Sequence, residues 1–173
     1  MQGRGFGYVN GLYRMYISPN PSGSSDSNWH VTYPALGPNL TDVTVEVDVV
    51  RSGNAPSVAS AWGITCRRID ANNFYAMGIR SDGSYYISIM KDGILSRLAL
   101  GEPGRATRTD TSRNHIRTEC TGSTLALYVN GQKLDEVEDT YHKSGGVGLF
   151  ENNNAVTGPA TDVLFDNFLV RKP

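Results

Sequence analysis

Apolar and polar residues alternate through many short runs of this chain, with the two-residue period of a half-buried β-strand. In the run 43–51, for example, Val45, Val47 and Val49 alternate with acidic Glu46 and Asp48. No window of a dozen residues keeps the 3.6-residue apolar period of an amphipathic helix. The pattern therefore predicts a chain of strands. The predicted strands are Tyr8–Ile17, Trp29–Thr32, Val43–Arg51, Val58–Arg68, Phe74–Arg80, Tyr85–Lys91, Ile94–Leu98, His115–Cys120, Leu125–Val129, Gln132–Val137, Val147–Glu151 and Val163–Arg171.

Turn-forming residues separate these runs. Asn130-Gly131 and Asp92-Gly93 are candidates for two-residue hairpin turns, because both pairs tolerate positive φ. Thr121-Gly122-Ser123 joins two further runs. Successive antiparallel hairpins are therefore expected along the chain.

The turn at Ser81–Gly83 determines which side chains share a face. A two-residue loop divides the neighbouring apolar residues between both faces of the hairpin. A three-residue loop with Gly83 in the left-handed conformation places Ile79 opposite Tyr85 and gathers the apolar residues on one face. We predict the second register. The residues it gathers are Tyr75, Met77, Ile79, Tyr85, Ile87 and Ile89.

Many short strands without helices predict an all-β fold, a two-sheet antiparallel jelly-roll sandwich. The 173 residues suit a single domain spanning 1–173. Two long polar loops, Ser18–Asn28 and Gly101–Asn114, are not flanked by the change of composition that marks a domain boundary.

The two cysteines, Cys66 and Cys120, each share a strand face with an isoleucine, Ile64 or Ile116. Both are therefore expected to point inward. A disulfide between them, within or across the sheets, is the favoured interpretation, and two separate buried thiols are the alternative. Neither cysteine lies in a cluster that could bind zinc. A disulfide would indicate an oxidising compartment.

Charge and hydropathy exclude several classes of partner. Sixteen Lys plus Arg and seventeen Asp plus Glu give a formal net charge of −1, so no long-range field attracts nucleic acid. No apolar run is long enough to span a membrane. The N-terminal residues lack the apolar run of a signal peptide.

Four segments of the sequence resemble a known superfamily. They are GITCRRIDANNFYAMGIRSDGSYYISIMKDG, HIRTECTGSTLALYVNGQKLDEVED, and the pair SGGVGLF and VLFDNFLVRK. Together they are similar to the concanavalin A-like lectins and glucanases, and especially to bacterial laminin G-like and 3-keto-disaccharide-hydrolase-like domains. The resemblance runs from about Val43 to Arg171 and implies a jelly roll that binds ligands on its concave face or rim loops. Its members include lectins, carbohydrate-binding modules, glycosidases and protein-binding domains, so the fold does not select one activity.

The best candidate for catalysis is Glu46-Val47-Asp48. The resemblance to glucanases implies a Glu-x-Asp-x-x-Glu strand, whose first Glu is the nucleophile and whose last is the acid/base. Here Arg51 or Ser52 stands where the second Glu belongs. Glycoside hydrolysis needs two carboxyl groups flanking the bond, so we predict no catalytic residues and interpret both acids as solvent-facing.

Metal chemistry has weak support. The three histidines are scattered, so no metal-ligand pair forms among them. Asp166-Asn167 could serve a structural calcium, as terminal strands of jelly-roll modules do, but calcium needs six or more oxygens. The alternative is a pair that hydrogen-bonds the backbone. No cofactor is predicted.

The residues expected to face outward combine guanidinium, carboxylate and phenol groups. Planar polar groups pair with sugar hydroxyls, and aromatic rings stack on sugar C–H surfaces. We therefore predict a non-catalytic carbohydrate-binding module of a secreted or cell-surface protein, binding an oligosaccharide or polysaccharide. Alternatives are a glycoside hydrolase and a structural or protein-binding ectodomain, and the chain could belong to a larger multidomain protein. The predicted ligand-binding residues are Arg67, Tyr86, Arg117 and Glu119, with Arg80 and Tyr128 at the margin.

Overall fold

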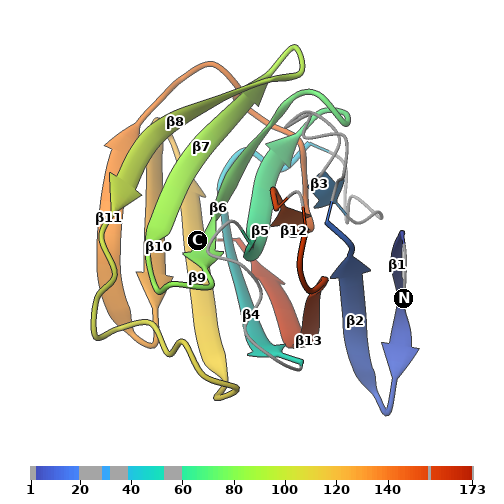
Figure 1. Ribbon diagram of the computed structural model, residues 1–173. Helices are drawn as coiled ribbons and strands as arrows, with labels where there is room; N and C mark the ends of the chain where they lie inside the picture. Colours follow the sequence, from blue (N-terminus) through green and yellow to red (C-terminus); the bar gives the residue numbers. More distant parts are fainter. Residues whose placement is uncertain (1–2, 20–28, 32–38, 53–59, 156, 173) are drawn as a thin grey trace.

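The structure is a computed structural model, which describes residues 3–19, 29–31, 39–52, 60–155 and 157–172 (Figure 1). These residues form thirteen strands and no helix. The described part of the chain therefore contains no helix that is long and apolar enough to cross a membrane. The strands are β1 (Arg4–Val9), β2 (Leu12–Ile17), β3 (Trp29–Val31), β4 (Val43–Arg51), β5 (Ser60–Arg68), β6 (Phe74–Arg80), β7 (Tyr85–Lys91), β8 (Ile94–Gly101), β9 (Asn114–Thr121), β10 (Thr124–Val129), β11 (Gln132–Glu138), β12 (Gly146–Asn153) and β13 (Thr161–Arg171).

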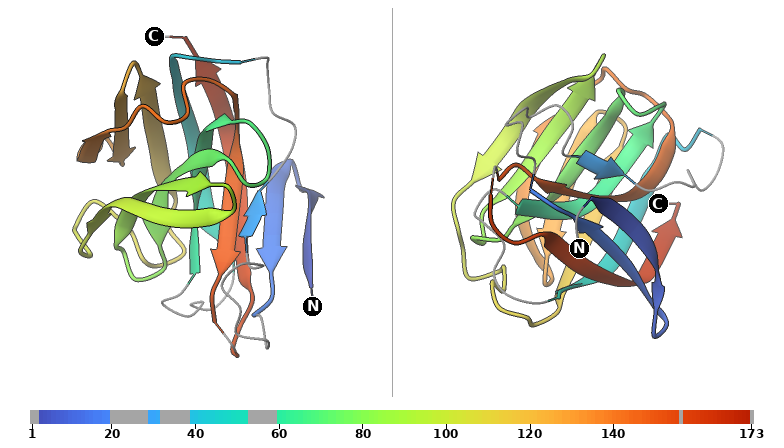
Figure 2. Two further views of the ribbon diagram at one scale, coloured as in Figure 1. Left: turned by 90° about the horizontal axis from the view of Figure 1, so that it is seen from above. Right: turned by 45° about the vertical axis from the view of Figure 1, so that its right-hand side comes forward.

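The strands make two antiparallel sheets that pack face to face (Figures 1 and 2). The seven-stranded sheet has the order β1-β2-β13-β4-β9-β10-β11, and the six-stranded sheet has the order β3-β12-β5-β6-β7-β8. The predicted all-β jelly-roll sandwich is confirmed. Because β13 lies between β2 and β4, the beginning and the end of the chain meet in the seven-stranded sheet.

The core lies between the two sheets, and the strand alternation explains why. Val43, Val45, Val47 and Val49 are at most 1% exposed, whereas the residues between them are partly exposed. Burying each valine contributes on the order of 1.5 kcal/mol or more. The inward faces of β6 and β7 supply Tyr75, Met77, Ile79, Ile87 and Ile89 to the same core, with Tyr85 packed against it.

Most predicted strands and turns are confirmed. Asn130 and Asp92 have φ values of 50°, and each precedes a glycine with positive φ in a two-residue turn. Ile79 pairs with Tyr85 and Gly83 has a φ of 90°, so the predicted three-residue register is correct. Thr32, Val58, Ala59 and most of the loop Ser18–Asn28 lie outside the described residues.

Two turns differ from the sequence prediction. Tyr8–Ile17 was predicted as one strand, but Asn10-Gly11 forms a hairpin turn that divides it into β1 and β2, with Val9 paired to Leu12. Both turn residues have positive φ, which Asn and Gly tolerate best. Between β9 and β10, Thr121 pairs with Thr124, so the turn contains two residues, Gly122 and Ser123.

Cys66 and Cys120 form a disulfide, as predicted. Cys66 lies on β5 of the six-stranded sheet and Cys120 on β9 of the seven-stranded sheet, so the bond crosses the core. Both cysteines are fully buried. The disulfide therefore fixes one sheet on the other.

A β-bulge interrupts β13. Its pairing with β4 shifts between Asp166 and Leu169, and Asn167 adopts a φ of 53°. Before the bulge Val163 and Phe165 point into the core, and after it Phe168 and Val170 pack against the core. The extra residue thus turns Asn167 toward the outer surface beside β4.

Candidate functional site

The structure does not bring the six predicted ligand residues together. Arg67, Arg80 and Tyr86 belong to the six-stranded sheet, whereas the other three belong to the seven-stranded sheet. The expectation that all six share one outward face is wrong, because outward from one sheet is opposite to outward from the other. The three on the seven-stranded sheet are Arg117, Glu119 and Tyr128.

Arg67 is buried and stabilises the fold, contrary to the predicted exposed position. It is 1% exposed, and its guanidinium donates to the backbone oxygens of Thr41 at 3.1 Å, His142 at 3.2 Å and Gly122 at 2.7 Å. Asp42 lies 3.9 Å away. Arg67 therefore connects three separate segments that join strands, and it is not available to an external ligand.

Tyr86 is also buried, within an aromatic cluster on the outer face of the six-stranded sheet. It is 4% exposed and contacts Trp29 and Phe150, with ring centroids 6.5 Å and 6.1 Å apart. Burial raises the pKa of its hydroxyl strongly. Within the described part of the chain, that hydroxyl has no hydrogen-bonding partner. The same is true of three nearby side-chain oxygens, those of Thr65, Ser88 (Oγ) and Asn152 (Oδ1). Arg80, at the end of β6, remains partly exposed.

The outer face of the seven-stranded sheet carries partly exposed polar side chains. We call it the polar face. Its residues are Glu46, Asp48, Arg113, His115, Arg117, Glu119, Tyr128, Asn167 and Arg171.

Three of the sequence-predicted residues meet on the polar face. Arg117 forms an ion pair with Glu119 at 3.0 Å, and its guanidinium carbon lies 3.9 Å from the centre of the Tyr128 ring. The Tyr128 hydroxyl donates to Glu119 at 3.0 Å. All three side chains are therefore held in place while they remain partly exposed.

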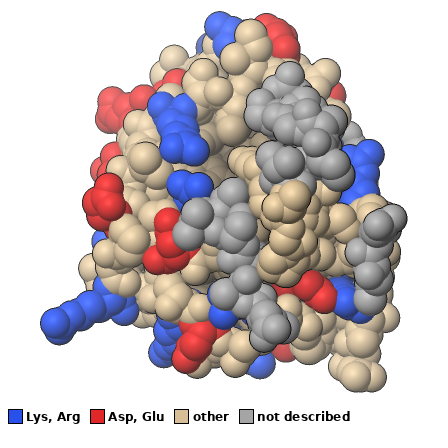
Figure 3. All heavy atoms as spheres, viewed as in Figure 1, with Lys and Arg blue, Asp and Glu red and all other residues tan. Residues whose placement is uncertain are grey.

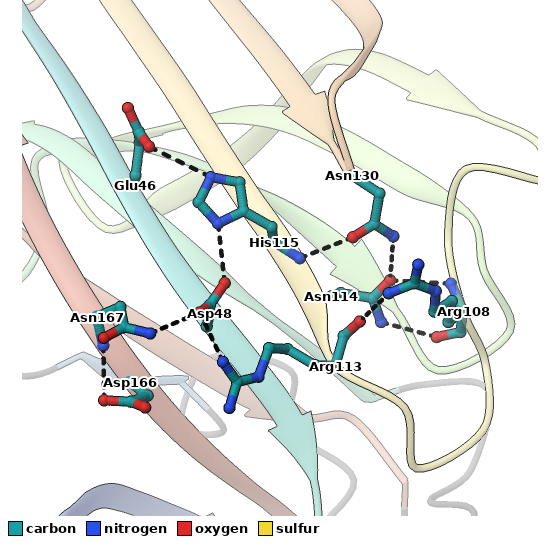
Figure 4. A network of polar contacts seen from close by, with 9 residues as sticks. All are labelled: Glu46, Asp48, Arg108, Arg113, Asn114, His115, Asn130, Asp166 and Asn167. Carbon is teal, nitrogen blue, oxygen red and sulfur yellow. Dashed lines mark hydrogen bonds and ion pairs between the residues drawn. The ribbon is translucent and has the colours of Figure 1, made fainter.

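His115 lies between two carboxylates on the same face (Figure 4). Its Nδ1 is 2.8 Å from Asp48 Oδ1, and its Nε2 is 3.3 Å from Glu46 Oε2. The imidazole is 42% exposed, whereas Glu46 and Asp48 are 16% and 14% exposed. Arg171 lies 3.4 Å from the other oxygen of Glu46.

Asp48 is the centre of this network (Figure 4). Besides His115, it accepts hydrogen bonds from Arg113 at 3.1 Å and from Asn167 at 2.7 Å. Burial raises the pKa of Asp48, but the hydrogen bonds from Asn167 and His115 and the charges of His115 and Arg113 outweigh it. The net pKa lies below its usual value, so Asp48 is a carboxylate at neutral pH.

Sequence reasoning identified Glu46 and Asp48 but missed their partners. The alternation did place both acids opposite the buried valines, as observed. The contribution of Asn167 could have been found, because the apolar positions Phe165 and Phe168 are three residues apart and break the period of two. Such a break is the sequence signal of a bulge. The sequence around Arg113 and Arg171 does not show that they contact Asp48 and Glu46. The pairing of distant strands brings both arginines to β4.

The structure gives little support to a metal site. Among residues 3–19, 29–31, 39–52, 60–155 and 157–172, no group of three or more His, Cys, Asp or Glu side chains is arranged to hold an ion. Asn167 donates its side-chain amide to Asp48 and its backbone N–H to Asp166. Asp166 thus accepts a hydrogen bond from the backbone, as in the alternative to calcium, whereas the Asn167 side chain bonds to Asp48 on β4.

Charges are interspersed on the opposite side of the molecule as well. In Figure 3, Lys and Arg residues alternate with Asp and Glu residues over the described surface, without one broad patch of a single sign. This distribution agrees with the net charge of −1.

Comparison with known proteins finds similarity in structure only. No protein-family profile matches the sequence, and no curated protein does. Among solved structures, the carbohydrate-binding module CBM66 from Bacillus subtilis has a TM-score of 0.71 at 17% identity, covering 99% of this chain and 97% of that one. Bacillus licheniformis β-glucanase has a TM-score of 0.64 at 11% identity, covering 97% and 82%.

A third similar structure is the GH43 protein BlXynB from Bacillus licheniformis, with a TM-score of 0.62 at 13% identity. It covers 95% of this chain but only 34% of its own. These matches support the concanavalin A-like sandwich fold. The finer resemblance to laminin G-like and 3-keto-disaccharide-hydrolase-like domains stays a prediction.

Proposed function

We propose that this protein is a non-catalytic carbohydrate-binding module and that the polar face binds the glycan. The observation that carries the proposal is the group Arg117, Glu119 and Tyr128, which is partly exposed and already ordered by its own contacts. A site ordered before binding loses little conformational entropy when the ligand arrives. The similarity to a carbohydrate-binding module over nearly the whole chain supports this function.

The chemistry of the polar face suits sugar hydroxyls. Guanidinium groups donate in a fixed planar fork, and carboxylates accept. Arg113, Arg117 and Arg171 have side chains that are 53%, 36% and 59% exposed, so each retains N–H groups directed to solvent. Each arginine is also paired with a carboxylate, which leaves no large excess charge. We therefore propose a neutral oligosaccharide or polysaccharide as the ligand.

A glycosidase is the second candidate, because a β-glucanase and a GH43 protein share the fold. The arrangement of Glu46 and Asp48 argues against it. Both acids contact the same imidazole, and Arg51 stands where the glucanase pattern has its acid/base Glu. The motif therefore lacks the second of the two carboxyl groups that hydrolysis needs on either side of the bond. Asp48, with its lowered pKa, is a poor proton donor at neutral pH.

A secreted or cell-surface location follows from the proposed ligand. The disulfide between Cys66 and Cys120 is the kind that persists in oxidising compartments. The carbohydrate-binding and glycosidase neighbours are consistent with that location. We also propose that this module belongs to a larger multidomain protein.

The test begins with a glycan array and continues with titration calorimetry on a bound oligosaccharide. Arg117→Ala should weaken binding by roughly 1 kcal/mol, or about fivefold, at an unchanged melting temperature. Arg97→Ala, on an exposed part of β8 in the other sheet, is the matched control and should bind normally. Unchanged affinity in Arg117→Ala would contradict the proposed surface.

A comparison variant addresses the opposite sheet. Tyr86→Phe removes an unpartnered buried hydroxyl from the aromatic cluster and keeps the ring. If Tyr86→Phe weakens binding and Arg117→Ala does not, the glycan binds the outer face of the six-stranded sheet instead. Hydrolysis of mixed-linkage β-glucan that disappears in Glu46→Gln would favour the glycosidase.

A further inference from the structure

The β1–β2 hairpin lies at one edge of the seven-stranded sheet (Figure 2), and it carries exposed aromatic side chains. In the β1–β2 hairpin, Phe6 pairs with Met15 and Tyr8 pairs with Tyr13. Cross-strand partners share a face, and Met15 is buried in the core. Phe6 and Tyr8 therefore point to the core side of the sheet, yet they are 61% and 79% exposed.

The two strands and β3 form one continuous aromatic surface. The ring centroids of Tyr8 and Tyr13 are 5.3 Å apart, and those of Phe6 and Tyr13 are 6.2 Å apart. Phe6 also contacts the ring of His30 on β3 at 5.4 Å. We call these four residues the aromatic ledge.

The composition of β1 concentrates its side chains on the ledge. Positions 5 and 7, which alternate with Phe6 and Tyr8, are glycines, so the other face of the strand carries no side chains between Arg4 and Val9. Gly5 has a packing reason, because a Cβ there would lie 2.7 Å from the ring of Tyr16 on β2. The exposed rings of Phe6 and Tyr8 are costly in water, and a ligand that covers them would remove this cost.

A buried carboxyl adjoins the ledge. Glu151 on β12 is 0% exposed, and its Oε1 lies 3.2 Å from Nδ1 of His30. Its Oε2 has no hydrogen-bonding partner among the residues that the structure describes. Burial, and then the charge of Asp162, raise the pKa of Glu151 to about 9, so the group is a neutral acid at pH 7. Buried polar atoms without partners are rare in folded proteins.

We propose that the aromatic ledge is a second carbohydrate-binding site, in which a neutral pyranose ring stacks on Tyr8 and Phe6. The ledge presents aromatic faces for sugar C–H groups, and the phenol group of Tyr8, which is 79% exposed, supplies a hydroxyl for hydrogen bonds to the sugar. Glu151 is fully buried and would orient His30 without contacting the sugar. A purely apolar partner would leave the Tyr8 hydroxyl unused. The inference rests on the proposed carbohydrate function, but it concerns a surface separate from the polar face.

The experiment maps both surfaces at once. Amide chemical shifts of the full chain are followed by NMR while laminarihexaose, cellohexaose or a xyloglucan oligosaccharide is added. Two groups of shifts are expected, one in β1 and β2 and one in β4 and β9. Tyr8→Ala should abolish the first group and lower affinity for the matching polysaccharide about tenfold, with an unchanged melting temperature. Tyr8→Trp keeps an aromatic face and should retain binding.

The controls separate the possible failures. Tyr141→Ala removes another exposed tyrosine, 49% exposed, and should change neither group of shifts. If the shifts are confined to β4 and β9 and Tyr8→Ala does not alter them, the ledge is not a carbohydrate-binding site. The proposed function of the polar face would then stand. No shifts with any carbohydrate on an array would overturn both. A dimer that Tyr8→Ala dissociates would overturn the sugar site by assigning the ledge to a second copy.

Discussion

Arg67 provides the most direct test of the distinction between a binding residue and a structural one. Replacing it with methionine keeps much of the side-chain volume but removes three hydrogen bonds to the backbone oxygens of Thr41, Gly122 and His142. A buried acceptor that loses its partner costs about 1 to 3 kcal/mol. Two of these bonds are only partly buried, and methionine avoids the desolvation of a charge. We therefore expect a net loss of about 3 kcal/mol.

Equilibrium unfolding in urea, followed by tryptophan fluorescence, measures this loss directly. In a domain of this size it corresponds to a fall in melting temperature of about 6 to 12 °C. Arg97→Met, at an exposed position on β8, is the matched control and should change stability by less than about 0.5 kcal/mol. A stability loss below about 1 kcal/mol in Arg67→Met, together with weaker glycan binding, would refute the structural assignment.

Three further predictions concern other buried or paired groups. Replacing Cys66 and Cys120 together with serine should lower the free energy of unfolding by about 4 kcal/mol, because the disulfide joins residues 54 apart; an unchanged urea midpoint would contradict this. The pKa of Asp48 is lowered, so its contribution to stability is present above its unfolded-state pKa and lost as the pH falls through its folded-state value. In Asp48→Asn the acid side of the stability profile should therefore be flatter, and a profile identical in shape to the wild type would count against the network. Glu151 has the opposite sign: it is held neutral while the unfolded chain ionises, so its effect on stability is absent below about pH 4 and grows unfavourable up to about pH 9. Glu151→Gln should thus be more stable than the wild type at pH 9 by at least about 1 kcal/mol, and less so at pH 5, as thermal unfolding at both values would reveal.

The strands were predictable wherever one face of a sheet is buried. Alternating valines in β4 and the apolar residues flanking Ser81–Gly83 have one arrangement that removes them from water, and the structure adopts it. The β1–β2 hairpin was missed because aromatic and aliphatic residues lie on both sides of Asn10-Gly11. Those residues read as one uninterrupted strand when the turn is not recognised.

The arrangement of the candidate site was not predictable by the same reasoning. Alternation shows whether a side chain points inward or outward, but not which sheet its strand joins. Cys66 and Cys120 were both correctly assigned to inward faces, yet they bridge opposite sheets. Arg117 faces outward from the seven-stranded sheet, whereas Arg67, beside the irregular pairing of β5 with β12, is buried against backbone oxygens. The two arginines therefore do not share a surface. The polar face depends on strand pairing between β4, β9 and β13, which only the three-dimensional structure reveals.

The place of β13 between β2 and β4 also affects how this domain can be made. Until Thr161–Arg171 has left the ribosome, the seven-stranded sheet has a gap with two unpaired strand edges. Unpaired edges recruit other chains, and contacts so distant in sequence form slowly. Folding of the sandwich must therefore wait for synthesis of its last strand. A nascent chain truncated before Thr161 should aggregate instead of forming a smaller stable domain.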